Sequence, residues 1–328
     1  MKRKGNLYEN TYKFENILSA FNEVCRNTKN KRKVANYKEY KSIYISRVYN
    51  VLSTNSYVVG PYNIFTIYEP KKRRIVSQSM HDKIINHLVS RHILYPAIIP
   101  CLIDANVASR TGLGTRKGIE LAINFHNACK LKYGKYYILK CDVSKFFASI
   151  DHDILKKKLR RKIKDQQALD IVFKIIDSDD SGLGIGNMSS QVLAIFYLND
   201  LDHYIKEVLK VKYYVRYQDD FLLFHPSKEH LKYCFEQIKI FLKKEKLTIN
   251  PNSIIYTNNN NFIFLGRNKA GKYLRYRSVS RKLKKRFYLY ENDIINLNGL
   301  ISSLACYNHL CTGKYLKFKN KFQELPKI

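Results

Sequence analysis

The chain has 328 residues, of which 45% are hydrophobic, and it carries 59 Lys and Arg against 27 Asp and Glu, a formal net charge of +32. The hydrophobic content excludes a disordered chain and is enough for one large core or for two to three subdomains. The charge argues against an ordinary enzyme of small metabolites and favours a polyanionic partner, above all nucleic acid.

The N-terminus gives no sign of export. Met1 to Lys4 is basic and no apolar stretch of a signal peptide follows it, so we expect a cytoplasmic protein. The longest apolar run, Ile93 to Ile103, is interrupted by Pro96 and Pro100 and is far shorter than a membrane span. We therefore expect no membrane partner.

Helices and short strands are expected in the first half of the chain, with no repeat or linker that would separate domains. Residues 10–50 are predicted to be helical, with a basic stretch at Lys29 to Lys33 that a solvated loop would also explain. The Gly-rich segment Arg110 to Gly118 could offer backbone amides to phosphate, although a plain loop fits equally well. The other elements expected here are strands at Tyr62 to Tyr68 and Arg73 to Val76, and helices from His81 to Tyr95 and from Ile119 to Cys129.

The second half is expected to alternate strands with longer helices. The tail from Arg267 carries 15 basic residues and three acids, which predicts a helical lobe that clasps a duplex backbone. The other elements expected, in order, are a strand from Tyr136 to Cys141, helices from Asp153 to Ile176, a turn from Ser181 to Gly186, a long helix from Met188 to Leu209, a basic helix ending near Lys246, and a strand pair near Ile255 and Phe264.

The cysteines give no framework for the fold. They are seven, an odd number, and form no C-x-x-C pair, which argues against a disulfide framework and against a zinc ribbon. Cys306, His309 and Cys311 lie close together, but their spacing fits no common zinc pattern.

Two adjacent carboxylates stand at the expected tip of a hairpin. Tyr217-Gln218-Asp219-Asp220 lies between two β-rich runs, Lys212 to Arg216 and Phe221 to Phe224. Strand alternation sends neighbouring side chains to opposite faces, so only a tight turn lets Asp219 and Asp220 approach one site. An ordinary solvated turn is the alternative for these four residues taken alone.

A third carboxylate follows the expected strand that ends at Cys141. Asp142 would join the hairpin if the two segments meet, although a helix N-cap is the simpler explanation of Asp142 alone. Two carboxylates about 4 Å apart repel by roughly 4 kcal/mol at an effective dielectric of 20, so such a cluster calls for a cation. Nucleotidyl transfer uses two divalent ions about 3.5–4 Å apart, held by carboxylates that converge from separate strands.

Several segments, in this order, resemble the motifs of bacterial reverse transcriptases. Lys140 to Asp151, with the sequence KCDVSKFFASID, resembles the first catalytic motif, and the Tyr-Gln-Asp-Asp hairpin resembles the second. Gly184 to Gln191 resembles the I/V/L-G-x-x-x-S-Q signature of diversity-generating retroelement enzymes, in which Gln191 replaces the proline of group II intron relatives. Tyr68 to Ile75 resembles the fingers strand, and Phe264-Leu265-Gly266 the primer grip.

The resemblance implies roles for individual residues. Asp142, Asp219, Asp220 and the Val143 carbonyl would hold two Mg²⁺ ions, with Mn²⁺ as an alternative. Ile185, Gly186 and Gln191 would border the templating base. Phe147 would reject a 2′-hydroxyl, its alternative being a core aromatic, since adjacent Phe146 and Phe147 cannot both face the site on an extended segment. The incoming nucleotide would contact Lys71, Lys72, Arg73, Arg74, Ser144, Lys145, Phe146, Phe147 and Gln191.

One position departs from the family pattern. Many relatives have L-x-L-N-x-x-K after the hairpin, with a lysine as the general acid, whereas Leu247 to Ser253 ends in serine. Water or a nearby lysine would then supply the proton.

The expected fold is α+β, a right-hand polymerase with fingers, a palm of antiparallel sheet and helices, and a short helical thumb. Its expected divisions are an N-terminal helical extension (1–59), fingers (60–135), palm (136–270) and basic thumb (271–328).

The resemblance implies an RNA-directed DNA polymerase of bacterial or phage origin that copies a structured template RNA, with errors at adenine. Its partners would be the template RNA, the cDNA/RNA duplex, dNTPs and a small basic accessory protein, in one or more copies. A defence-associated reverse transcriptase and a non-enzymatic RNA-binding scaffold are the alternatives.

Overall fold

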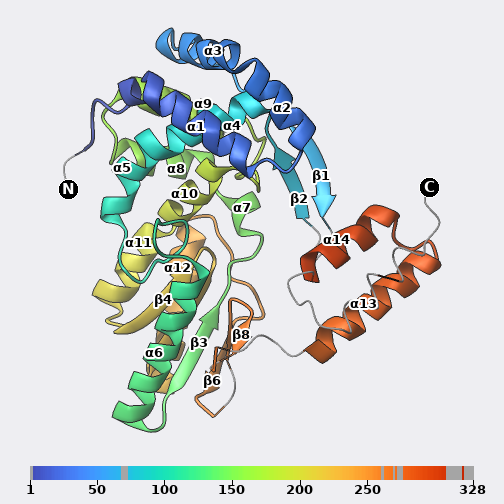
Figure 1. The fold of residues 1–328 in the computed structure, drawn as a ribbon. Helices are drawn as coiled ribbons and strands as arrows, with labels where there is room; N and C mark the ends of the chain where they lie inside the picture. The colour runs from blue at the N-terminus through green and yellow to red at the C-terminus, as the bar shows by residue number, and fades with distance from the viewer. Residues whose placement is uncertain are drawn as a thin grey trace.

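The computed structural model describes residues 3–67, 73–259, 262–268, 270–271, 276–307 and 320. At its centre lies a four-stranded antiparallel sheet with the order β4-β5-β3-β6 (Figure 1). The strands are β3 (Tyr137–Cys141), β4 (Tyr213–Tyr217), β5 (Asp220–His225) and β6 (Ile254–Thr257).

Alternating side chains cover both faces of this sheet with apolar contacts, as period-2 strands require. Leu139, Cys141 and Leu223 face one core, which the helices behind the sheet complete. Ile138, Leu222 and Phe224 face a second, smaller core. Besides the N-terminal helices described below, the first core contains α8 (His152–Arg160), α9 (Gln166–Ile176), α10 (Met188–Tyr197), α11 (Asn199–His203) and α12 (Lys228–Lys244).

Helix α6 (Thr115–Tyr133) covers the other face of the sheet. It contacts β4 and β5, and its Ala122 and Cys129 join Phe262 and Phe264 in the smaller core. The expected helix from Ile119 to Cys129 is therefore present and longer at both ends.

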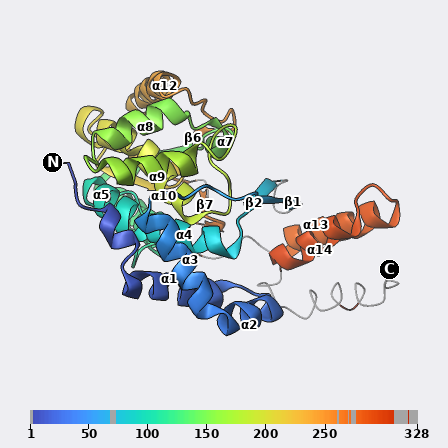
Figure 2. The same cartoon turned by 90° about the horizontal axis from the view of Figure 1, so that it is seen from above.

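The N-terminal helices form a layer that packs against α10 (Figure 2). The basic stretch at Lys29 to Lys33 is not a loop throughout, because α2 begins at Lys31 and the Asn30 side chain caps it. The helices of this layer are η1 (Tyr8–Thr11), α1 (Phe14–Asn27), α2 (Lys31–Glu39), α3 (Lys41–Ser53), α4 (Met80–Val89), the π-helical turn η2 (Ser90–Leu94), α5 (Tyr95–Ile98) and η3 (Ile99–Cys101).

A two-stranded hairpin, β1 (Asn63–Ile67) and β2 (Arg73–Ser77), projects from this layer. The helices α13 (Tyr276–Glu291) and α14 (Leu297–Tyr307) pack on each other and stand apart from the sheet, with α14 against β1 (Figure 1).

Two expectations about elements were wrong in detail. The segment Met188 to Leu209 is not one helix, because Leu198 interrupts it between α10 and α11, and α11 continues into the π-helical η4 (Tyr204–Val208). The segments near Ile255 and Phe264 are strands that do not pair with each other. β6 extends the central sheet along β3, whereas β7 (Ile263–Phe264) pairs with β8 (Arg267–Asn268) across a tight turn.

Among the described residues, no helix is both long enough and apolar enough to cross a membrane. The proposed roles of Lys71 and Lys72, and the rejected zinc pattern that ends at His309 and Cys311, fall outside the described residues.

Candidate active site

Asp142 directly follows β3, on the face that α6 covers further along the strand. Its carboxylate accepts a hydrogen bond from Asn250 Nδ2 at 2.8 Å, and its backbone amide donates to Ser253 Oγ at 3.3 Å. The helix that follows begins at Phe146, after Lys145. The helix-cap alternative for Asp142 is therefore wrong, and its carboxylate is held at the end of the sheet.

The tip of the β4–β5 hairpin is a two-residue turn. Tyr217 pairs with Asp220, which leaves Gln218 and Asp219 between the strands, and Gln218 has φ +55°, in the left-handed region that favours glycine. Cys141 lies opposite Phe221 in the β3–β5 register, so Asp220 comes beside Asp142. Asp142 and Asp220, 78 positions apart in the sequence, thus meet at one end of the sheet.

The three carboxyl groups are electrostatically coupled. Burial, followed by the charge of Asp142, raises the pKa of Asp219 to about 6. Burial is also the largest cause that raises the pKa of Asp220 to about 7, opposed by Lys140 and reinforced by Asp142 and Asp219. Burial and mutual repulsion therefore outweigh the neighbouring positive charges at these two carboxyl groups.

Lys140 joins this cluster to the segment expected to be the primer grip. It lies two residues before Asp142 and so on the same face of β3. Its Nζ donates to the Ile263 carbonyl at 2.7 Å, and its charge lowers the pKa of Asp220. The backbone amide of Leu265 also lowers that pKa. The turn at Leu265 and Gly266 therefore lies at the carboxylates, while the Phe264 side chain is buried in the smaller core.

Some residues after Asp142 are buried in the core, and others remain accessible to a ligand. Val143 is buried in the main core, so only its backbone could serve a ligand. Phe146 is also buried there, whereas Phe147 is half-buried and contacts Phe146 edge to face. Contact between the Phe146 ring and a nucleotide does not fit this burial, and we leave Phe146 out of the proposed site. Ser144 is half-buried and Lys145 exposed.

The two arginines of β2 act on different carboxyl groups. The charge of Arg73 lowers the pKa of Asp219, whereas the charge of Arg74 lowers the pKa of Asp179. Neighbouring residues of a strand face opposite ways, which accounts for this difference. Arg73 is therefore the one whose charge is felt at the carboxylate cluster.

The expected template motif packs directly against β2. The Val76 amide donates to the Ile185 carbonyl at 3.0 Å. Gly186 has φ +130°, and a Cβ there would come within 2.8 Å of the Val76 carbonyl oxygen. Only glycine allows this approach, so the pattern Ile-Gly is explained by contact with β2.

Gln191 is exposed on the first turns of α10, whose start is fixed by buried bonds between Asn86 and Ser189. Ser109 Oγ donates to Gln191 Oε1 at 3.4 Å, and Gln218 Nε2 donates to Ser109 Oγ at 2.9 Å. Gln191 is thus connected to the Gln218–Asp219 turn through one hydroxyl group.

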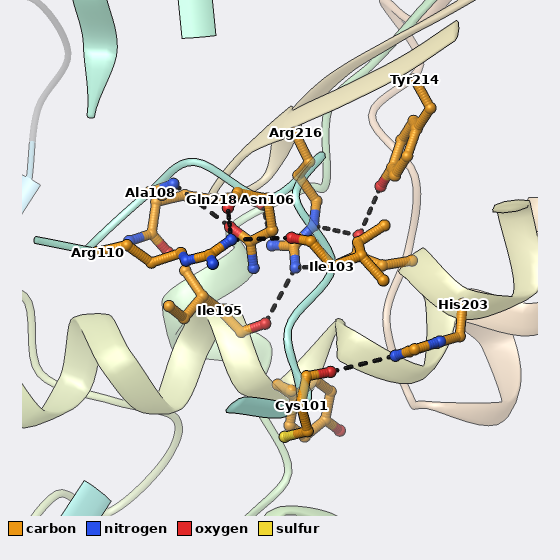
Figure 3. Close-up of polar contacts among 12 residues, drawn as sticks. Cys101, Ile103, Asn106, Ala108, Arg110, Ile195, His203, Tyr214, Arg216 and Gln218 are labelled. Atoms are coloured by element: carbon orange, nitrogen blue, oxygen red, sulfur yellow. Dashed lines mark hydrogen bonds and ion pairs between the residues drawn. The ribbon is translucent and has the colours of Figure 1, made fainter. Parts of the chain in front are cut away.

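A buried ion pair lies beneath the turn and was missed in the sequence. Arg216 and Asp202 both have 0% exposure, and Arg216 Nε donates to Asp202 Oδ1 at 2.6 Å. Its Nη1 donates to the Gln218 carbonyl at 2.8 Å and its Nη2 to the Ile195 carbonyl at 3.0 Å (Figure 3). Arg216 therefore holds the strained residue of the turn against α10 and α11. Nothing in the sequence marks the pair, since Asp202 lies on a helix 14 positions earlier.

The carboxylate cluster fits a hard divalent cation. Asp220 Oδ1 is buried and has no hydrogen-bond partner in the described part of the chain. Carboxylate oxygens are the ligands that Mg²⁺ prefers. Among the described residues no three His, Cys, Asp or Glu side chains already surround one point, and Asn250 engages Asp142. Nucleotide and water would have to complete the coordination.

An acidic hairpin turn beside a second acidic strand end, on an antiparallel sheet backed by helices, defines the palm of a right-hand polymerase. The family model described as reverse transcriptase (RNA-dependent DNA polymerase) matches residues 26–268. The chain therefore belongs to the reverse transcriptase family, whose members use divalent metal ions.

A curated protein matches this chain over most of its length. The putative COX1/OXI3 intron 1 protein of Saccharomyces cerevisiae is 24% identical over 252 residues, 71% of this chain. The chain spans only 28% of that relative's length.

A solved telomerase structure with a TM-score of 0.50 confirms the α+β right-hand fold. An apo telomerase from Candida tropicalis, truncated from its C-terminal domain, matches with a TM-score of 0.50 and 14% identity, over 72% of this chain and 58% of that one. Telomerase from Candida albicans, in complex with a TWJ fragment of telomeric RNA, matches with a TM-score of 0.48 and 13% identity, over 88% and 59%.

Proposed function

We propose that this protein is an RNA-directed DNA polymerase, and that Asp142, Asp219 and Asp220 are its catalytic residues. The observation that carries the proposal is the meeting of Asp142 with the Gln218–Asp219 turn, where burial and mutual charge raise the pKa of two carboxyl groups. Primer extension on a defined RNA template tests it.

The same carboxylates are the proposed ligands of two Mg²⁺ ions, or of Mn²⁺, together with the Val143 carbonyl. Asp220 Oδ1, buried without a partner in the described structure, is the atom that most needs a cation. When bound, such ions activate the primer hydroxyl and neutralise the triphosphate. The protein's own contribution is to hold the acids: Asn250 orients Asp142, and Arg216 fixes the turn. Ser253 bonds the Asp142 backbone, so we assign the general acid to water or a neighbouring lysine.

The incoming nucleotide is proposed to bind between β2 and the segment after Asp142. Arg73 would pair with the triphosphate, since its charge acts on Asp219. Arg74 would instead interact with Asp179, next to the template motif. Ser144 and Lys145 would contact the same nucleotide. Phe147 would stack under the sugar, because Phe146 is in the core and Phe147 is left half-exposed.

Arg73→Ala is expected to raise the KM for dNTP on the order of tenfold to a hundredfold, because a charge-assisted contact to phosphate is worth about 1.5–3 kcal/mol. Arg74→Ala, its neighbour on the other face of β2, is the matched control and should raise KM less than about threefold. Steady-state single-nucleotide incorporation measures both KM values. The same assay with ribonucleotides tests whether Phe147 rejects a 2′-hydroxyl. A larger effect at Arg74 than at Arg73 would reverse the assignment.

The nucleic acid is proposed to lie between the β1–β2 hairpin, the central sheet and the basic helix α13. Ile185, Gly186 and Gln191 would border the templating base, and the turn Phe264-Leu265-Gly266 would hold the primer end. The exposed cations of α13, among them Arg281, Lys282, Lys284 and Lys285, would contact the duplex backbone. In this proposal residues 1–59, 60–135, 136–270 and 271–328 are extension, fingers, palm and thumb, with α6 packed on the palm sheet from the fingers side.

Among reverse transcriptases we favour the diversity-generating retroelement type, acting in a bacterial or phage-infected cytoplasm with a small basic accessory protein. Gln191 supports this choice, because it stands where group II intron enzymes have proline. A defence-associated reverse transcriptase shares the same core. A non-enzymatic RNA-binding scaffold would leave the coupled carboxylates without a use.

The retroelement assignment predicts a skewed error spectrum. Misincorporation opposite adenine should exceed that opposite each other base on the order of tenfold, the equivalent of about 1.4 kcal/mol of lost discrimination. Deep sequencing of cDNA made from one defined RNA template, with and without the accessory protein, gives the four error rates. Equal error rates at all four bases in both conditions would favour the defence-associated alternative.

A further inference from the structure

Residues 103–110, the bracing loop, are fixed to the catalytic hairpin as an additional edge of the sheet. The Arg216 amide donates to the Ala105 carbonyl at 2.8 Å, and the Val107 amide donates to the Arg216 carbonyl at 3.1 Å. Arg110 Nη1 closes the loop by donating to the carbonyls of Ile103 and Asn106, at 3.0 and 2.9 Å (Figure 3). The loop is therefore bonded to β4, the strand that leads into the Gln218–Asp219 turn.

Ser109 is held at the free end of this loop. Its carbonyl accepts a hydrogen bond from Tyr95 Oη at 2.7 Å. Its backbone φ is +51°, a value that residues other than glycine rarely adopt. A strained backbone kept in place by several bonds is frequently a functional one. Its consequence here is that the Ser109 hydroxyl projects between two glutamines.

The hydroxyl links the two glutamines in one direction. Gln218 Nε2 donates to Ser109 Oγ at 2.9 Å, and Ser109 Oγ donates to Gln191 Oε1 at 3.4 Å. Gln191 accepts this bond through its side-chain oxygen and not through its NH₂ group, so the bond distinguishes the two ends of the amide. Gln218 Oε1 is buried with no partner in the described structure. The bond from Gln218 Nε2 to Ser109 Oγ is therefore the one that the Gln218 side-chain amide makes there.

We propose that Ser109 is a specificity-determining residue that fixes the amide orientation of Gln191 relative to the catalytic turn, and so sets how strictly the nascent base pair is checked. The proposal rests on the proposed polymerase function. Without the hydroxyl, the Gln191 amide is free to rotate and presents its donor and acceptor to the base pair indiscriminately. Ser109 acts through Gln191 and is a positioning residue, not a catalytic one.

The test is a double-mutant cycle on fidelity, using the full-length chain with an RNA template and a DNA primer. Ser109→Ala, Gln191→Ala and the double variant are compared with wild type for kcat/KM of right and wrong dNTP opposite each template base. Thr115→Ala, which removes an exposed hydroxyl at the start of α6, is the matched control. Ser109→Gly is a second variant without the hydroxyl, and it relieves the positive φ.

Ser109→Ala and Ser109→Gly should change the ratio of wrong to right incorporation on the order of tenfold, at the same template base as Gln191→Ala, with kcat for the right dNTP within about twofold of wild type. The double variant should match the larger single change, because both substitutions remove one interaction. Effects that multiply, or a wild-type ratio in both Ser109 variants, overturn this inference alone. A wild-type protein that extends no primer overturns the proposed function as well.

Discussion

Asp219→Asn is expected to reduce the rate of nucleotide incorporation on the order of a thousandfold or more, with folding and RNA affinity retained. The loss follows from removing one charged ligand from a proposed metal site on which the transition state depends. The fold should tolerate the amide, because burial and the charge of Asp142 already raise the pKa of Asp219 to about 6, so a negative charge there is unfavourable in the metal-free protein.

Primer extension and RNA binding would be measured side by side for Asp219→Asn and Asp142→Asn. Asp153→Asn, an exposed acid in the first turn of α8, is the matched control and should behave as wild type. Incorporation within about tenfold of wild type in either of the first two variants would remove those residues from the catalytic set.

The second large effect is expected from the ion pair beneath the turn. Arg216→Met leaves Asp202 charged, fully buried and without its ionic partner, and breaking such a pair costs about 3–5 kcal/mol of unfolding free energy. Asp202→Leu together with Arg216→Met removes both charges and should recover part of that loss, because the buried Tyr214 hydroxyl then lacks the Asp202 Oδ1 acceptor. Denaturant unfolding measures the stability of all three proteins.

Activity separates stability from positioning in this pair. The double variant still lacks the bond from Arg216 Nη1 to the Gln218 carbonyl, so its kcat should stay on the order of tenfold or more below wild type even though it is folded. Lys239→Met removes an exposed pair with Glu236 and should cost less than about 1 kcal/mol. A folded double variant with wild-type kcat would show that the pair serves stability alone.

The sequence predicts the acidic residues well because their pattern is local. A β-rich run on each side of Tyr217 to Asp220 predicts a hairpin, and an apolar strand that ends at Cys141 places Asp142, the third carboxylate, at the end of the sheet. The palm sheet and most helices follow from periodicity. Errors arose where short segments choose their partners by tertiary contact, as β6 and β7 do.

The supporting residues could not be predicted in the same way. Asp202 and Arg216 meet because a helix packs beneath a strand, and Ser109 meets Gln191 across 82 positions of sequence. Lys140 is an exception, since strand alternation alone places it on the face of Asp142. Asn250 is another, since it is the asparagine of the L-x-L-N-x-x-K pattern, and the structure places it on the Asp142 carboxylate.

The central claim is tested most directly by incubating the purified chain with an RNA template, an annealed DNA primer, Mg²⁺ and dNTPs, beside Asp219→Asn prepared in the same way. The account predicts extension of the wild-type primer in the order that the RNA dictates, its dependence on the divalent ion, and no comparable extension by the variant. Wild-type protein that binds the duplex but adds no nucleotide, with Mg²⁺ or Mn²⁺ and with the accessory protein present, would contradict it.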